Sequence, residues 1–123
     1  MWLLLLLFGE FMKLYQKLKQ NWEFHRAYKR GTACVSPAFV LYVCKGKKNQ
    51  VRLGITAGKK IGTAVNRNRA KRVVTAAFNS IIAHVPTGYD YVIVVRTRIL
   101  TQKSTQVALS LEKHLKDKKL WIA

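Results

Sequence analysis

The chain has 123 residues, which is enough for one compact domain with a single core. Half of the residues are hydrophobic, and this excludes a chain that stays disordered for want of a core. Lys and Arg together number 23 against five acidic residues, and the formal net charge of +18 predicts a polyanionic partner, most simply a nucleic acid. An anionic membrane surface is the alternative, but the basic residues do not form one face of a single long amphipathic helix.

The first eleven residues differ in character from the rest. Residues 3–8 form a very apolar run, too short to span a bilayer, which takes about 20 apolar residues. The run also lacks the positively charged start and the cleavage site of a signal peptide. Met12 opens a more ordinary sequence, so we expect residues 1–11 to be an extra upstream leader and residues 12–123 to form a single domain. The alternative is that the leader acts as a hydrophobic anchor or docking peptide.

The first expected helix follows this leader. Asn21 can cap it, Glu23 suits its first turn, and Lys29 and Arg30 suit its last turn. Gly31 is a residue typical of the position just after a helix. We therefore expect a short helix that ends at Gly31.

Three strands are expected further along the chain. Residues 39–44 and 51–56 are rich in β-forming types and are joined by a basic turn, as in a hairpin. Gly54 and Gly58 suggest a bend, a bulge or the close approach of another backbone. Residues 89–96 are almost continuously apolar, which predicts a strand in the centre of a sheet.

Two longer helices are expected at about 65–83 and 101–118. Apolar residues recur at helical spacing in the first at Ala70, Val73, Val74, Ala77 and Ile81 and in the second at Val107, Leu111 and Leu115. Either Ser104 or Thr101 can cap the second helix. The order is a helix, two or three strands, a helix, a strand and a helix, roughly αβββαβα. This order predicts an α+β fold in which helices pack on one sheet in a two-layer α/β sandwich.

The stretch 59–72 carries six basic residues and no acidic residue. Its second half is expected to begin a helix, where cations oppose the positive end of the helix dipole. Arg67 and Lys71 repel at i,i+4, and Arg69 and Arg72 repel at i,i+3. An external anion would relieve this repulsion, and the residues able to bind it are Lys59, Lys60, Arg67, Asn68, Arg69, Lys71 and Arg72.

A catalytic site within the protein is disfavoured. Two-metal phosphodiester hydrolysis needs clustered carboxylates, whereas the acids are scattered at Glu10, Glu23, Asp90, Glu112 and Asp117. Acid–base catalysis without metal could use a histidine, but His25, His84 and His114 each lie on an otherwise ordinary helix. The phosphate-binding motif GxxxxGK[ST] is absent from the sequence. We expect no catalytic residue and no metal site in the protein alone.

Cys34 and Cys44 are the only cysteines. They lack CxxC spacing and lie far from every histidine in the sequence, so no zinc ligand set is visible. We expect reduced thiols in a cytoplasmic protein, with a disulfide as the less favoured alternative.

Four aromatic residues are of the kind that stacks single-stranded bases: Phe24, Tyr28, Phe39 and Tyr42. Phe24 and Tyr28 share a helix face with Ala27, so the alternative for these two is a plain core position. A basic patch with an aromatic groove predicts an RNA-binding domain that treats structured and single-stranded segments differently.

Residues 52–72 contain a glycine-bearing strand, a pair of lysines, a glycine and then Ala-Val-x-Arg-Asn-Arg-x-Lys-Arg from Ala64 onward. This pattern closely resembles the signature of bacterial ribonuclease P protein subunits. The resemblance extends to Glu23-Phe24 with Tyr28 and Gly31, to residues 39–42 and to residues 90–94, and it covers about residues 13–118.

The resemblance implies a left-handed βαβ crossover, as in a domain of a small-subunit ribosomal protein. It implies an accessory subunit of ribonuclease P, an endoribonuclease whose RNA subunit, with Mg²⁺, removes the 5′ leader of precursor tRNA. Catalysis would reside in that RNA. The partners would be the catalytic RNA and precursor tRNA, with no membrane expected and no obligate protein partner evident.

By the same resemblance, the seven residues named above between Lys59 and Arg72 would bind the RNA subunit, and the four aromatic residues would line a cleft for the leader. This chain departs from the family in having Tyr28 where Phe is usual and Gly58 where Ser or Pro is usual. A ribosomal or RNA-chaperone protein without a processing role is the first alternative. A cationic peripheral membrane protein anchored by residues 1–8 is the second.

Overall fold

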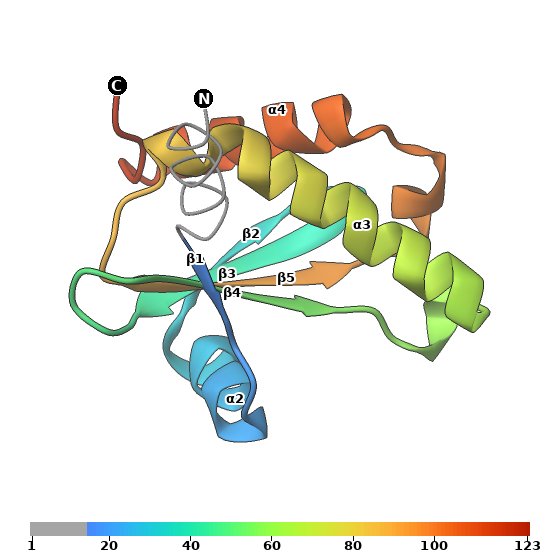
Figure 1. The fold of residues 1–123 in the computed structure, drawn as a ribbon, viewed down its shortest axis with the longest axis horizontal. Coiled ribbons are helices and arrows are strands. Elements are labelled where there is room, and N and C mark those ends of the chain that lie inside the picture. The colour runs from blue at the N-terminus through green and yellow to red at the C-terminus, as the bar shows by residue number, and fades with distance from the viewer. Residues whose placement is uncertain (1–14) are drawn as a thin grey trace, which may run out of the picture.

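The computed structural model describes residues 15–123 (Figure 1). The expected leader 1–11 and the expected start at Met12 lie outside these residues. The described part contains three α-helices and five strands: β1 (Tyr15–Lys17), α2 (Asn21–Arg30), β2 (Thr32–Val35), β3 (Phe39–Lys45), β4 (Val51–Thr56), α3 (Ala64–Ile81), β5 (Tyr89–Val95) and α4 (Ser104–Asp117). Short 3₁₀ turns lie at η1 (Lys59–Ile61), η2 (Ile82–His84) and η3 (Thr97–Thr101).

The strands form one mixed sheet in the order β1-β4-β5-β3-β2. β5 is central as predicted, parallel to β4 and antiparallel to β3. The prediction that β3 and β4 form a hairpin is wrong, because β5 lies between them. The apolar run of β5 explains this position, since Tyr91, Val92 and Ile93 are fully buried only with a strand on each side.

Helices cover both faces of the sheet, so the predicted two-layer arrangement is incomplete. α3 and α4 lie on one face and α2 lies on the other (Figure 1). Successive side chains of β3 point to opposite faces of the sheet, so the core has two parts. Leu41 and Val43 pack in the part formed with α3 and α4. Tyr42 and Cys44 face the smaller cluster under α2.

The predicted buried stripes of the long helices are largely confirmed. α4 buries Val107, Leu111 and Leu115. α3 buries Ala70, Val74, Ala77 and Ile81 as expected, and it also buries Phe78, whereas Val73 is only partly buried. Because Phe78 extends the stripe by one residue beside Ala77, the buried face of α3 is wider than the predicted one.

Two helix starts differ from the prediction by one or more residues. α2 is preceded by Gln20 rather than capped by Asn21, and the Gln20 N–H donates to Glu23 Oε1 at 3.1 Å. α4 is preceded by Lys103 rather than by Thr101 or Ser104, and the Lys103 N–H donates to Gln106 Oε1 at 2.9 Å. In both helices a side chain from the first turn reaches back to the cap backbone, which replaces a polar cap side chain.

Cys34 and Cys44 are both free thiols, and they belong to the clusters on opposite faces of the sheet. A disulfide between them would have to pass through the sheet, so this fold excludes it. Burial raises the pKa of both thiols, and the protonated form that this favours is unreactive. Among residues 15–123, no helix is long and apolar enough to cross a membrane.

Candidate RNA-binding surface

The basic stretch forms the connection from β4 into α3. After Thr56 the chain passes through η1 and then through Gly62, whose φ of +110° is a conformation that favours glycine. Thr63 caps α3, because its Oγ1 accepts a hydrogen bond from the Asn66 N–H at 3.3 Å. This turn leads the chain from β4 into α3, which runs back over one face of the sheet (Figure 1) and exposes most of the basic side chains of its first turns.

Among residues 15–123, the cations of this surface have no counter-ion. The four ion pairs found within residues 15–123 use Arg26, Arg52 and Lys116 as their cations. Arg67 is half-buried, and its Nε is buried without a hydrogen-bond partner. The other predicted RNA-subunit contacts are all exposed: Lys59, Lys60, Asn68, Arg69, Lys71 and Arg72. The uncompensated charge inferred from the sequence is therefore present in the structure.

A cleft lies between α2 and the start of α3. Its two adjoining hollows share Phe24, Ile55 and Lys71, and they are lined by α2, by β4 and by α3. Within residues 15–123, β1 pairs with β4 only over Val51–Leu53. The last three residues of β4 are therefore paired on the β5 side alone, and their other edge borders the cleft.

Gly54 makes room for the aromatic wall of the cleft. A Cβ at this position would lie 2.6 Å from the ring of Phe24, closer than any normal contact. The sequence suggested a bulge or a close backbone approach at Gly54, but its neighbour is this aromatic side chain. Only glycine at this position of the strand lets the Phe24 ring pack so close to β4.

Three of the four predicted cleft aromatics lie together. Tyr28 is 37% exposed, and its hydroxyl is 3.3 Å from Thr56 Oγ1. Its ring packs edge-on against Tyr42 with a centroid separation of 5.0 Å. Phe24 and Tyr42 are half-buried and pack against the smaller core cluster. Phe24 and Tyr42 thus support the wall structurally, while Tyr28 presents its ring to solvent.

Phe39 does not line this cleft, and the prediction that it does is wrong. It is fully buried in the cluster under α3 and α4, where its ring meets His114 with centroids 6.2 Å apart. Phe39 and Tyr42 are three residues apart on one strand, and an odd spacing puts two side chains on opposite faces of a sheet. The spacing of the two residues in the sequence therefore already indicated that only one of them could face the cleft.

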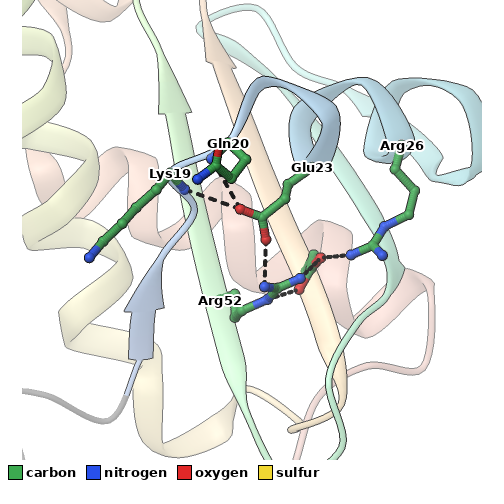
Figure 2. A network of polar contacts seen from close by, with 6 residues as sticks. Lys19, Gln20, Glu23, Arg26 and Arg52 are labelled. Carbon is green, nitrogen blue, oxygen red and sulfur yellow. Dashed lines mark hydrogen bonds and ion pairs between the residues drawn. The ribbon is translucent and has the colours of Figure 1, made fainter.

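A buried ionic network attaches α2 to the sheet, and sequence reasoning missed it. Arg52 on β4 donates from Nε and Nη2 to the two carboxylate oxygens of Asp90, each at 2.7 Å, and it also pairs with Glu23 of α2. Arg26 of α2 donates to Asp90 Oδ2 at 2.7 Å. Figure 2 shows Glu23 and Arg26 converging from α2 on the network around Arg52.

The network fixes the charge state of Arg52 and the position of α2. The hydrogen bonds that Arg52 donates to Asp90 raise the pKa of Arg52 above its ordinary value, so this arginine stays charged. Glu23 also accepts from the Lys19 and Gln20 N–H groups, which holds the start of α2 in place. Since Glu23 and Asp90 are both occupied by arginines, neither is free to act on a ligand. No cluster of three or more possible metal ligands is found among residues 15–123.

Known proteins match both the sequence and this fold. The protein-family model described as Ribonuclease P matches residues 12–119. The chain is 37% identical over 110 residues to the ribonuclease P protein component of Shouchella clausii, covering 89% of this chain and 90% of that protein. It is 46% identical over 89 residues to the ribonuclease P protein component of a Nitratiruptor species, covering 72% and 79%.

Solved structures agree with these matches. The ribonuclease P protein of Staphylococcus aureus superposes with a TM-score of 0.73 at 33% identity, covering 85% of this chain and 96% of that one. The ribonuclease P protein of Thermotoga maritima gives a TM-score of 0.73 at 27% identity, covering 83% and 96%.

Proposed function

The chain belongs to the family of bacterial ribonuclease P protein components, and from this premise we propose that its cleft and its basic surface divide the work of binding RNA. It is the protein component of the ribonuclease P ribonucleoprotein, an endoribonuclease of tRNA processing. In the proposed division, the start of α3 binds the catalytic RNA and the cleft binds the 5′ leader of precursor tRNA.

The observation that carries this proposal is the position of Lys71. Its side chain is exposed on the basic start of α3, and it also lines both hollows of the cleft. A leader in the cleft and an RNA bound along α3 would therefore meet at one residue. This arrangement would hold the leader close to the RNA that cuts it.

Binding to the RNA subunit follows from charge and geometry. Arginine can bind a phosphate through two parallel hydrogen bonds, whereas lysine acts as a point charge. We infer that Lys59, Lys60, Arg69, Lys71 and Arg72 neutralise phosphates, that Arg67 does so from its half-buried position, and that Asn68 contacts a base or a sugar hydroxyl. Phosphates at the start of α3 would also relieve the adverse interaction of these cations with the helix dipole.

Selection of precursor over mature tRNA follows from the aromatic wall. An unpaired base that stacks on an aromatic ring gains roughly 1–3 kcal/mol. The leader supplies unpaired bases, and mature tRNA lacks them at this end. We infer that Phe24, Tyr28 and Tyr42 form the leader-binding wall and that Phe39 supports the opposite face of the sheet.

Three finer expectations accompany this role. Mg²⁺ would be bound with the RNA subunit rather than by the protein alone. The holoenzyme would act in the cytoplasm. The β4-α3-β5 unit joins two neighbouring parallel strands, and the family resemblance predicts that this crossover is left-handed, against the usual preference.

Reconstitution tests the proposed function. Protein and its cognate ribonuclease P RNA are mixed at low magnesium concentration, and cleavage of precursor tRNA is followed in parallel with cleavage by RNA alone. We expect the protein to raise the cleavage rate and to cut nothing without the RNA. An unchanged rate would contradict the proposal and would favour a ribosomal or RNA-chaperone role instead.

The cleft is tested in the same assay with Tyr28→Ala. We expect the affinity of the holoenzyme for precursor tRNA to fall about fivefold or more, because one stacked base is lost, while the affinity for mature tRNA is unchanged. Tyr28→Phe keeps the ring and removes only the hydroxyl contact to Thr56, so it should retain binding. An equal loss for both RNAs would place Tyr28 among the structural residues.

A further inference from the structure

The outer face of α2 carries an exposed tryptophan within a basic hollow. Trp22 is 58% exposed, and the hollow beside it is lined by Trp22, His25, Arg26, Lys29 and Arg30. This hollow lies on another side of α2 from the cleft, and the two share only His25 among their lining residues. An exposed indole among cations is a surface to which nucleic-acid bases and phosphates are complementary.

The indole of Trp22 packs against the side chain of Arg26. The guanidinium carbon of Arg26 lies 5.1 Å from the centre of the indole ring, within the range of a cation–π contact. Arg26 is itself fixed by its hydrogen bond to the fully buried Asp90. A chain of contacts therefore connects the sheet to the indole, and a platform that is already positioned loses little entropy when a base stacks on it.

The charge around Trp22 has one sign. Glu23 is the acid of α2, but it is buried and paired with Arg52. Lys29 and Arg30 are exposed, and neither forms an ion pair within residues 15–123. A phosphate backbone that passes the outer face of α2 would meet cations and no exposed carboxylate of this helix.

His25 connects this hollow to the cleft. It lines the outer hollow and also the cleft, and its ring lies 6.2 Å from that of Tyr28. Tyr28 in turn contacts Tyr42. Trp22, His25 and Tyr28 are spaced three residues apart, so each successive ring is turned by on the order of 60° around α2. The aromatic surface of the cleft thus continues around the helix to Trp22.

We propose that Trp22 stacks a base of the precursor's 5′ leader upstream of the nucleotides in the cleft, with Lys29 and Arg30 binding the adjoining phosphates. This inference rests on the proposed leader-binding cleft and extends it. The leader is the occupant favoured over the RNA subunit, because α2 lies on the face of the sheet opposite α3 and α4 (Figure 1). The strand would leave the cleft at His25 and cross α2.

The test uses the holoenzyme and precursors with leaders from about 4 to about 16 nucleotides, the range of single-strand site sizes. We expect the affinity of wild-type holoenzyme to rise with leader length. Trp22→Ala should remove the part of this rise that comes from the longer leaders, weakening their binding about fivefold or more, and should leave the shortest leader unaffected. Trp22→Phe should restore much of the loss.

The matched control is Leu109→Ala, which removes another exposed large side chain, 66% exposed on α4, and should change nothing. Melting curves of the free variants are compared with that of the wild type to check that the fold is intact. Equal weakening of all precursors, or weaker binding of the RNA subunit, would overturn the proposal by placing Trp22 against the catalytic RNA or in the fold. Unchanged binding of long leaders would overturn it as well. If even wild-type holoenzyme does not prefer precursor over mature tRNA, the proposed function itself fails.

Discussion

Arg52 and Arg69 belong to the same strongly basic chain, yet their surroundings are opposite. Arg52 is buried in the sheet between the carboxylates of Glu23 and Asp90. Arg69 is exposed at the start of α3, where the first turn contains no acidic residue. The chain has five acidic residues in all, and two of them form ion pairs with this single buried arginine.

The difference reflects the cost of an unpaired charge in each place. A buried cation without a partner loses its hydration and strongly destabilises the fold, so Arg52 needs its carboxylates. An exposed cation keeps its water and tolerates the absence of a partner. The start of α3 can therefore stay uncompensated in the free protein, whereas Arg52 is paired with carboxylates inside the protein itself. Net charge by itself does not distinguish these two uses of arginine.

The largest effect on stability is expected from Asp90→Ala. This change leaves Arg52 buried without its main partner and releases Arg26, and breaking a buried pair in this way typically costs about 3–5 kcal/mol. Denaturant unfolding monitored by circular dichroism measures the loss. Asp117→Ala removes an exposed acid on α4 and should have little effect. Equal stability of the two variants would show that the buried network is not essential to the fold.

A smaller effect is expected from Gly46→Ala. The added Cβ would lie 2.2 Å from Asp90 Oδ1, and Arg52 prevents the carboxylate from moving aside. We expect a loss of about 1–3 kcal/mol in the free energy of unfolding, as for an overpacked core. Gly58→Ala is the matched control, because nothing lies within 4 Å of its Cβ. If both alanine variants are equally stable, the Asp90 carboxylate can move to make room for the added Cβ despite its hydrogen bonds to Arg52.

No effect on stability is expected from the double change Arg69→Ala and Arg72→Ala, because neither side chain is paired within residues 15–123. Affinity for the ribonuclease P RNA should fall, and the slope of log affinity against log salt should decrease by about one for each lost phosphate contact. Lys113→Ala with Lys118→Ala removes the same charge from the last turns of α4 and the residue after it, and should leave the slope unchanged. A drop in the melting temperature of the arginine variant would assign these residues to the fold instead.

Local patterns predicted most of the elements and the charged surface. Apolar spacing places α3 and α4 within a few residues of their observed bounds, and the apolar run of residues 89–95 identifies the central strand. These features depend on neighbours along the chain, and sequence periodicity reports such neighbours directly. β1 was not predicted, and β2 was expected only as a third strand without bounds in the order αβββαβα, because strands of three and four residues are too short for a periodicity to be recognised.

Whether a candidate residue belongs to the site depends on the face of the sheet to which its side chain points. Phe39 and Tyr42 are both aromatic residues of β3, but only Tyr42 faces α2. Strand alternation could have separated them, whereas no local pattern could have paired Arg52 with Asp90, which is 38 residues away. The role of Gly54 likewise depends on Phe24, which comes from another element.

The sequence by itself determined the partner's sign of charge, the resemblance to the family, the order of most elements and the basic start of α3. These are properties of composition and of short segments, and they do not require contacts between distant residues. Only the tertiary structure decided that β5 separates β3 from β4 and that α2 covers the face of the sheet opposite α3 and α4. It also decided that Glu23, Arg52 and Asp90 form one network and that Trp22 packs against Arg26, which is bonded to that network. Each of these depends on bringing together segments far apart in the chain, because a buried charge or an aromatic wall is completed only by residues from several elements.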